Sequence, residues 1–134
     1  MYDFNSVTMH GLAQQFKALS EDVRLQILAL MFRHGELCVC EIERFLHISQ
    51  SKASRHLRYL LNAGLVEDRR DGLWVYYRAT EPTTEKQRTF FVALRQMLAD
   101  VPVPDVAEEL EAMRAERCQP TSAKQGAAST SSAE

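Results

Sequence analysis

Two short helical patterns separated by a three-residue turn constrain this chain more than any other feature of its sequence. The first runs from about Val39 to Leu46 and has apolar residues three and four positions apart. The second begins after Ser49, whose hydroxyl suits a helix N-cap, and ends at Gly64, a residue type that often follows a helix. Two helices in this arrangement are typical of a helix-turn-helix.

A β-hairpin is predicted directly after the second helix. The residues from Leu65 to Arg70 lead into Asp71-Gly72, which is a strong signal for a two-residue turn. The residues from Leu73 to Arg78 then alternate between two sets of side chains, as in a strand with two different faces. A hairpin in this position predicts the wing of a winged helix.

Amphipathic helices are predicted on both sides of this unit. Before it, apolar residues recur at helical spacing over Leu12–Leu19, and a second helix is expected between Ser20 and Gly35. After it, Phe90–Leu98 forms another apolar stripe, and a last helix is expected around Leu110. The predicted fold is therefore an α+β winged helix-turn-helix, mostly α-helical with a small β-hairpin.

Length and composition divide the chain into three parts. A chain of 134 residues, 46% of them hydrophobic, can bury one core without disulfides or a structural metal. We assign residues 1–100 to a winged-helix domain for DNA binding and dimerisation, and residues 101–118 to an acidic helix that carries Cys118. Residues 119–134 are mostly small and polar and are predicted to form a disordered tail.

The cysteines and the apolar runs indicate a cytoplasmic protein without a membrane partner. An odd number of cysteines, three, and the lack of a secretory leader favour reduced thiols. No run approaches the ~20 consecutive apolar residues of a membrane-spanning helix. The sequence also lacks a phosphate-binding glycine loop and an HExxH zinc motif, so an enzyme is not expected.

Charge is distributed unevenly, although the formal net charge is only −2. Between Gln50 and Arg78, six basic residues stand against three acidic ones, and the second helix of a helix-turn-helix enters the major groove of DNA. At the turn of the wing, Arg69 and Arg70 are predicted to contact the minor groove or nearby phosphates. On the second helix, the candidate contacts to bases and phosphates are Gln50, Ser51, Lys52, Ser54, Arg55 and His56.

Three segments of the sequence together resemble the ArsR family, also called ArsR/SmtB, of metal-responsive repressors. They are FKALSEDVRLQIL (Phe16–Leu28), ELCVCEI (Glu36–Ile42) and SQSKASRHLRYLLNAGLVEDRRDGLWVYYR (Ser49–Arg78). The resemblance implies a homodimer that binds double-stranded operator DNA and leaves it when an inducer binds. It also implies dimerisation through the first and last helices of the domain. The apolar residues expected in that interface are Leu12, Phe16, Leu19, Phe90, Leu94 and Met97.

Cys38 and Cys40, at the start of the short helix, are the predicted inducer site. Arsenite, antimonite, cadmium and lead are soft ions that prefer thiolate ligands. On a regular helix, residues two apart point about 200° away from each other, so both sulfurs are expected to converge only if that turn unwinds. This distortion would disturb the ~34 Å spacing of the two reading helices of a dimer, and DNA would be released.

The resemblance, applied to the other metal-ligating residues, favours trivalent arsenic or antimony over cadmium or lead. Cadmium and lead sensors add cysteines from an N-terminal arm, and residues 1–37 contain none. Zinc sensors use carboxylates and histidines on the last dimer helix, and Thr83–Leu98 contains no histidine. The best-known arsenite sensors have a third cysteine where this chain has Glu43, so Cys118 or a hydroxide is expected as the third ligand. No permanently bound cofactor is expected.

Several alternatives remain open at this point. A cadmium or lead sensor uses the same fold, as does a sensor of mono-organic arsenicals, which need only two thiolates. Oxidation of Cys38 with Cys40, or of either with Cys118, is another trigger that would release DNA. A winged helix that serves only as a protein-interaction module is the alternative of a different class.

Overall fold

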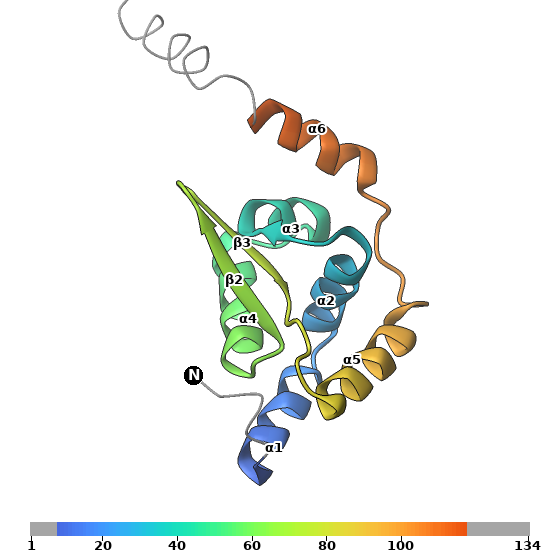
Figure 1. Ribbon diagram of the computed structural model, residues 1–134. Helices are drawn as coiled ribbons and strands as arrows, with labels where there is room; N and C mark the ends of the chain where they lie inside the picture. Colours follow the sequence, from blue (N-terminus) through green and yellow to red (C-terminus); the bar gives the residue numbers. More distant parts are fainter. Residues whose placement is uncertain (1–7, 118–134) are drawn as a thin grey trace, which may run out of the picture. The chain divides into compact units, whose positions relative to one another are not determined.

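The predicted helices and the predicted hairpin follow one another in the expected order in the computed structural model, which describes residues 8–117 (Figure 1). The chain divides after Pro104 into two compact units. In the second unit, α6 (Ala107–Arg117) begins just after Asp105, whose carboxylate accepts a hydrogen bond from the Ala107 N–H at 3.3 Å. The first unit is built from α1 (Met9–Ala18), α2 (Asp22–His34), β1 (Leu37–Cys38), α3 (Val39–Leu46), α4 (Gln50–Asn62), β2 (Val66–Asp71), β3 (Trp74–Ala79) and α5 (Glu85–Leu98).

Helix α4, the reading helix of the predicted helix-turn-helix, begins and ends where the sequence indicates. The Ser49 hydroxyl caps it by accepting a hydrogen bond from the Lys52 N–H at 3.2 Å. Gly64 follows the helix with a φ of +77°, a left-handed conformation that glycine adopts without a steric penalty. In the turn before α4, His47 also has a positive φ of 56°, and α3 and α4 are therefore separated by only three residues.

The strands form one antiparallel sheet in the order β1-β3-β2. Strand β1 was not predicted from the sequence, because a strand of two residues leaves no alternation to detect. In the sheet, Leu37 pairs with Tyr77, and Cys38 pairs with Tyr76. The wing is therefore joined to the segment that leads into α3.

The turn at the tip of the wing lies one residue later than predicted. Asp71 still pairs with Trp74, so the two-residue loop is Gly72-Leu73 rather than Asp71-Gly72. Gly72 has a φ of +62°, and Leu73 lies outside the left-handed region. A positive φ at the first loop residue alone is the pattern of a type II′ turn, which matches the twist of a hairpin.

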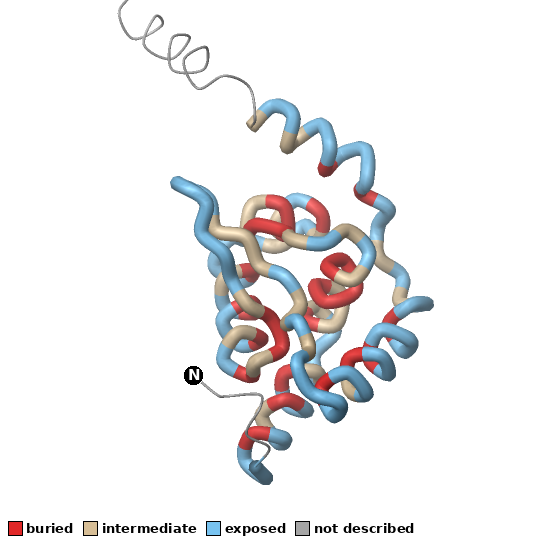
Figure 2. The backbone as a smooth tube through the Cα atoms, viewed as in Figure 1, coloured by how far each residue is buried: buried red, intermediate tan, exposed pale blue. Residues whose placement is uncertain are grey.

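Helix α2 forms the centre of the first unit and contacts α4, α5 and β3. Figure 2 shows buried positions along α2, whereas the tip of the wing is exposed. Full burial of each large apolar side chain stabilises the fold by roughly 1.5–3 kcal/mol. The largest apolar side chains that are fully buried are Ile27, Leu28, Leu30, Leu37, Ile42, Leu57, Leu60 and Leu65.

A buried arginine joins three helices. The guanidinium of Arg24, on α2, donates hydrogen bonds to the Ala18 carbonyl at 2.7 Å and the Lys17 carbonyl at 3.2 Å, at the end of α1. It also lies 3.2 Å from His56 Nδ1 and 4.1 Å from the centre of the Tyr59 ring, both on α4. A positive charge at a helix C-terminus is favourable, and Arg24 therefore holds α1 and α4 in place relative to α2.

We expect Arg24→Met to lower the free energy of unfolding by about 2–3 kcal/mol, because it leaves carbonyls at the end of α1 without their donor. Urea unfolding followed by circular dichroism measures this change. Arg88→Met is the matched control, since exposed Arg88 pairs with Glu85 one helical turn away. This control is expected to change stability by less than about 0.5 kcal/mol. Equal losses in the two variants would contradict a bridging role for Arg24.

Candidate functional site

The two cysteines of the predicted inducer site lie at the junction between β1 and α3. Cys38 ends β1 and is the N-cap of α3, with an extended backbone of φ −96° and ψ 169°. The sulfur atoms of Cys38 and Cys40 are 2.9 Å apart, and both are free cysteines. The prediction that this turn must unwind before the sulfurs converge is therefore wrong. The helical period does not govern Cys38, because the residue precedes the helix.

A buried carboxylate holds this junction. The side chain of Glu41 is fully buried, and its Oε1 accepts a hydrogen bond from the Cys38 N–H at 2.9 Å. Burial of Cys38, its hydrogen bond with Cys40 and the negative charge of Glu41 raise the pKa of the Cys38 thiol to about 12. Cys38 is therefore a protonated, weakly nucleophilic thiol at neutral pH.

The two thiols differ in their exposure to solvent. Cys38 is buried, whereas Cys40 is half-buried. Within residues 8–117, no group of three cysteine, histidine or acidic side chains is arranged to hold a metal ion. Cys118, the predicted third ligand, lies outside the described residues. The described part of the chain thus offers two sulfurs that fit a soft ion, and not a complete three-ligand site.

The N-terminal half of α4 carries most of the predicted DNA contacts on its surface. Of these, Ser54 is half-buried, and the exposed ones are Gln50, Ser51, Lys52 and Arg55. Arg58 is also exposed and was not predicted, although it lies one helical turn after Arg55. Within residues 8–117 neither arginine takes part in an ion pair. Both line a hollow between α1 and α4, together with Gln14, Tyr59 and Asn62.

His56 does not belong to this exposed face. It is buried, and its Nδ1 accepts a hydrogen bond from the Arg24 guanidinium, which can only donate. The assignment of His56 to the DNA-contacting face was wrong because Ala53, Leu57 and Leu60 define the buried stripe of α4, and position 56 falls within it. This spacing was visible in the sequence.

The two arginines of the wing differ in their contacts. Glu36 accepts two hydrogen bonds from the Arg69 guanidinium, at 2.9 Å from Nε and 2.8 Å from Nη2. Arg70 is exposed and forms no ion pair with any residue in the described range 8–117. Arg70 is therefore available to a phosphate, whereas Arg69 must first leave Glu36.

The predicted dimer residues also divide into two groups. Phe16 and Met97 have exposed fractions of 58% and 69%. Leu12 is exposed as well, and Leu19 and Phe90 are half-buried. Leu94 is buried within its own chain, on the stripe of α5 that also contains Phe91 and Leu98, so the side chain is not available to a partner. The exposed apolar residues that the sequence analysis missed on α1 and α5 are Met9 and Val92.

Comparison with known proteins identifies the family. Residues 21–68 match the model of bacterial regulatory proteins of the arsR family. An arsenical resistance operon repressor of Bacillus subtilis is 36% identical over 77 residues, which are 58% of this chain and 73% of that protein. The chain belongs to the ArsR family. Members of the ArsR family are DNA-binding transcriptional regulators and not enzymes.

Other ArsR-family relatives are named for resistance to arsenic or to cadmium. The arsenic resistance transcriptional regulator ArsR1 of Pseudomonas putida is 54% identical over 63 residues, 47% of this chain and 49% of that protein. A cadmium resistance transcriptional regulatory protein, a CadC homolog of Staphylococcus aureus, is 45% identical over 65 residues, 48% of this chain and 54% of that protein. The chain thus spans about half the length of these two relatives.

The ArsR-family fold also has solved counterparts. The solution structure of Mb0332 from Mycobacterium bovis is that of a homodimeric winged helix-turn-helix DNA-binding domain of a possible ArsR-family regulator. It is 36% identical to this chain, covers 75% of it and 88% of its own length, and has a TM-score of 0.58. The predicted winged helix-turn-helix is confirmed. No helix within residues 8–117 is long and apolar enough to cross a membrane.

The buried imidazole of this ArsR-family member leads to a pH prediction. Burial lowers the pKa of His56 below its usual 6.5, and Arg24 adds to this effect while Glu21 opposes it. The unfolded chain therefore binds this proton more readily than the folded chain, and stability should fall as the pH drops below about 6.5. We expect His56→Asn to reduce that fall in urea unfolding between pH 7.5 and 5.5. The matched control is His47→Asn at an exposed imidazole, and an undiminished pH dependence in His56→Asn would contradict the assignment.

Proposed function

We propose that this ArsR-family chain is a metalloid-responsive transcriptional repressor. It binds operator DNA as a homodimer and is released when trivalent arsenic, or antimony, binds the thiolates of Cys38 and Cys40. The observation that carries this proposal is the pair of free sulfurs 2.9 Å apart, at the start of the helix-turn-helix.

The chemistry of the thiol pair supports a soft ion as the inducer. Two sulfurs form a donor set that hard cations such as calcium and magnesium do not prefer. Cys40 is half-buried and provides access, whereas Cys38 is buried and deprotonates only with a partner that replaces its proton. Cys38 and Cys40 supply two ligands, and Cys118 is the candidate for the third. With Cys38 and Cys40 alone, the pair suits a mono-organic arsenical.

Surface charge and exposed apolar residues support the DNA-bound homodimer. Arg55, Arg58 and Arg70 are exposed, and within residues 8–117 none of them forms an ion pair, so all three can neutralise phosphates. Phe16 and Met97 lie exposed on α1 and α5, the two helices through which we propose that the subunits pair. Exposed apolar side chains of this size are costly in water and are buried when a second copy covers them.

Cadmium is the second candidate inducer, because one relative is named for cadmium resistance. The family resemblance implies that cadmium sensors add cysteines from an N-terminal arm, and residues 1–37 contain none. Oxidation of the two free thiols is the alternative trigger. Release of DNA by arsenite, cadmium and peroxide, measured side by side, distinguishes these triggers.

We expect Cys38→Ser and Cys40→Ser to bind operator DNA as the wild type does and to lose release by arsenite. In the wild type, arsenite should weaken operator binding about 5–150-fold, which is the usual range of allosteric coupling. Fluorescence anisotropy of a labelled promoter fragment, with and without arsenite, measures both quantities. A cysteine variant that still dissociates normally would refute the proposed site.

The variant Cys118→Ser tests whether Cys118 is the third ligand. Arsenic X-ray absorption on the loaded protein counts sulfur neighbours, and a loss of one neighbour in Cys118→Ser assigns that residue. An unchanged count assigns two-thiol binding to Cys38 and Cys40.

DNA binding itself should depend on salt in a way that distinguishes the two wing arginines. The logarithm of affinity falls with the logarithm of salt concentration, with a slope of about −0.9 for each neutralised phosphate. We expect Arg70→Gln to reduce the magnitude of this slope by about one, and Arg69→Gln to reduce it less, because Glu36 already binds Arg69. A salt-independent interaction would instead favour a protein-interaction module.

A further inference from the structure

One row of residues crosses the sheet from the thiol pair to the wing. Cys38 on β1 pairs with Tyr76 on β3, and Tyr76 pairs with Arg69 on β2. Paired residues of neighbouring strands project to the same face of a sheet. Glu36, two residues before Cys38, lies on that face as well, since side chains of an extended chain alternate.

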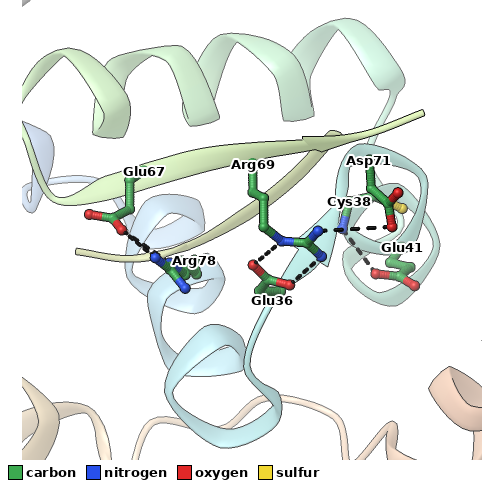
Figure 3. A network of polar contacts seen from close by, with 7 residues as sticks. All are labelled: Glu36, Cys38, Glu41, Glu67, Arg69, Asp71 and Arg78. Atoms are coloured by element: carbon green, nitrogen blue, oxygen red, sulfur yellow. Dashed lines mark hydrogen bonds and ion pairs between the residues drawn. The ribbon is translucent and has the colours of Figure 1, made fainter. Parts of the chain in front are cut away.

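The contact between Glu36 and Arg69 links the two ends of this row. Figure 3 shows the Arg69 side chain reaching from β2 to the carboxylate of Glu36, with hydrogen bonds of 2.8 and 2.9 Å. The Arg69 guanidinium also lies 5.0 Å from the centre of the Tyr76 ring. The side chains of Arg69 and Glu36 are 46% and 25% exposed, so the pair is partly shielded from water.

The thiol pair needs such a connection if it acts as a switch, because its sulfurs are already together while α3 is helical. An ion bound by both sulfurs takes the place of the proton that they share in their hydrogen bond. Their separation of 2.9 Å must therefore change when the ion binds. Cys40 lies within the first turn of α3, whereas Cys38 lies in β1, so a shift of Cys38 displaces that strand.

We propose that the Glu36–Arg69 ion pair transmits the structural effect of ligand binding at the thiol pair to the wing. This inference rests on the proposed function and names a route for it. A shift of Cys38 carries Glu36 with it, and the bidentate contact then moves Arg69 and the strand β2. Arg70, the neighbouring residue on β2, moves with that strand and loses its alignment with phosphate. Glu36 and Arg69 are thus positioning residues, which act through the wing.

The chain contains a reporter for the wing and a matched control. Trp74 is the only tryptophan in the sequence and is the first residue of β3, so its fluorescence reports on the tip of the wing. At the other end of the same hairpin, Glu67 binds Arg78 with the same 2.8 Å distance between a guanidinium nitrogen and a carboxylate oxygen. Both residues of this second pair lie within the hairpin and bridge β2 to β3 rather than to β1.

The experiment compares wild type, Glu36→Gln and Glu67→Gln without DNA. Sodium arsenite is added while Trp74 emission is recorded, and bound arsenic is measured on the same samples. We expect all three proteins to bind arsenite equally. The change in Trp74 emission should be present in wild type and Glu67→Gln and should be at least halved in Glu36→Gln.

The outcomes separate this inference from the proposed function. If wild type binds no arsenite, the proposed function fails. If all three proteins bind arsenite and show the same change in Trp74 emission, the ion pair is not the route and the proposed function stands. A reduced change in both variants also overturns the inference, because it indicates a general effect of charge on the hairpin.

Operator affinity gives a second, independent readout. The ratio of affinities without and with arsenite should fall about two- to fivefold in Glu36→Gln, the size expected from a partly exposed ion pair. Arg69→Gln should lower the ratio by the same factor, and the double variant should lower it no further, as expected for partners in one contact. Additive losses in the double variant would overturn the pairing of these two residues in the route.

Discussion

The change from strand to helix at Cys38 is the constraint on which the rest of the structure depends. Its extended backbone pairs with β3, and its N–H donates to the buried carboxylate of Glu41 within α3. Because Cys38 precedes the helix, its sulfur is not directed by the helical period and meets the sulfur of Cys40. One residue therefore belongs to the sheet, to the start of the helix-turn-helix and to the thiol pair.

The arginines of the chain serve two different purposes, and only their contacts tell these apart. Arg24 and Arg69 are bound within the protein, the first by carbonyls at the end of α1 and the second by Glu36. Arg55 and Arg70 are exposed and, among residues 8–117, have no acidic partner. The first pair stabilises the arrangement of α1, α2, α4 and the wing. Arg55 and Arg70 leave positive charge on the surface, although the formal net charge of the whole chain is −2.

Local signals predicted much of the fold and part of the site. The hydroxyl of Ser49 and the left-handed Gly64 mark the ends of α4 in the sequence as they do in the structure. The two cysteines were recognisable as a pair because two thiols flank a single residue at the start of a helix-turn-helix. Leu94 was misplaced because an apolar residue type does not reveal which neighbouring stripe of α5 is buried, and the packing of the helix on the first unit decides it. His56 was misplaced although the spacing of Ala53, Leu57 and Leu60 already marked its stripe in the sequence.

The sequence by itself determined the order of helices, the wing and the presence of two neighbouring thiols, because caps, glycines and periodic apolar residues act within a few positions of the chain. Only the tertiary structure decided that the thiols already meet and that Glu36 holds Arg69. Both depend on the pairing of β1 with β3, which joins Cys38 to Tyr76. Such pairing between distant segments is set by how the whole first unit packs, and a two-residue strand contains no sequence pattern that could predict it.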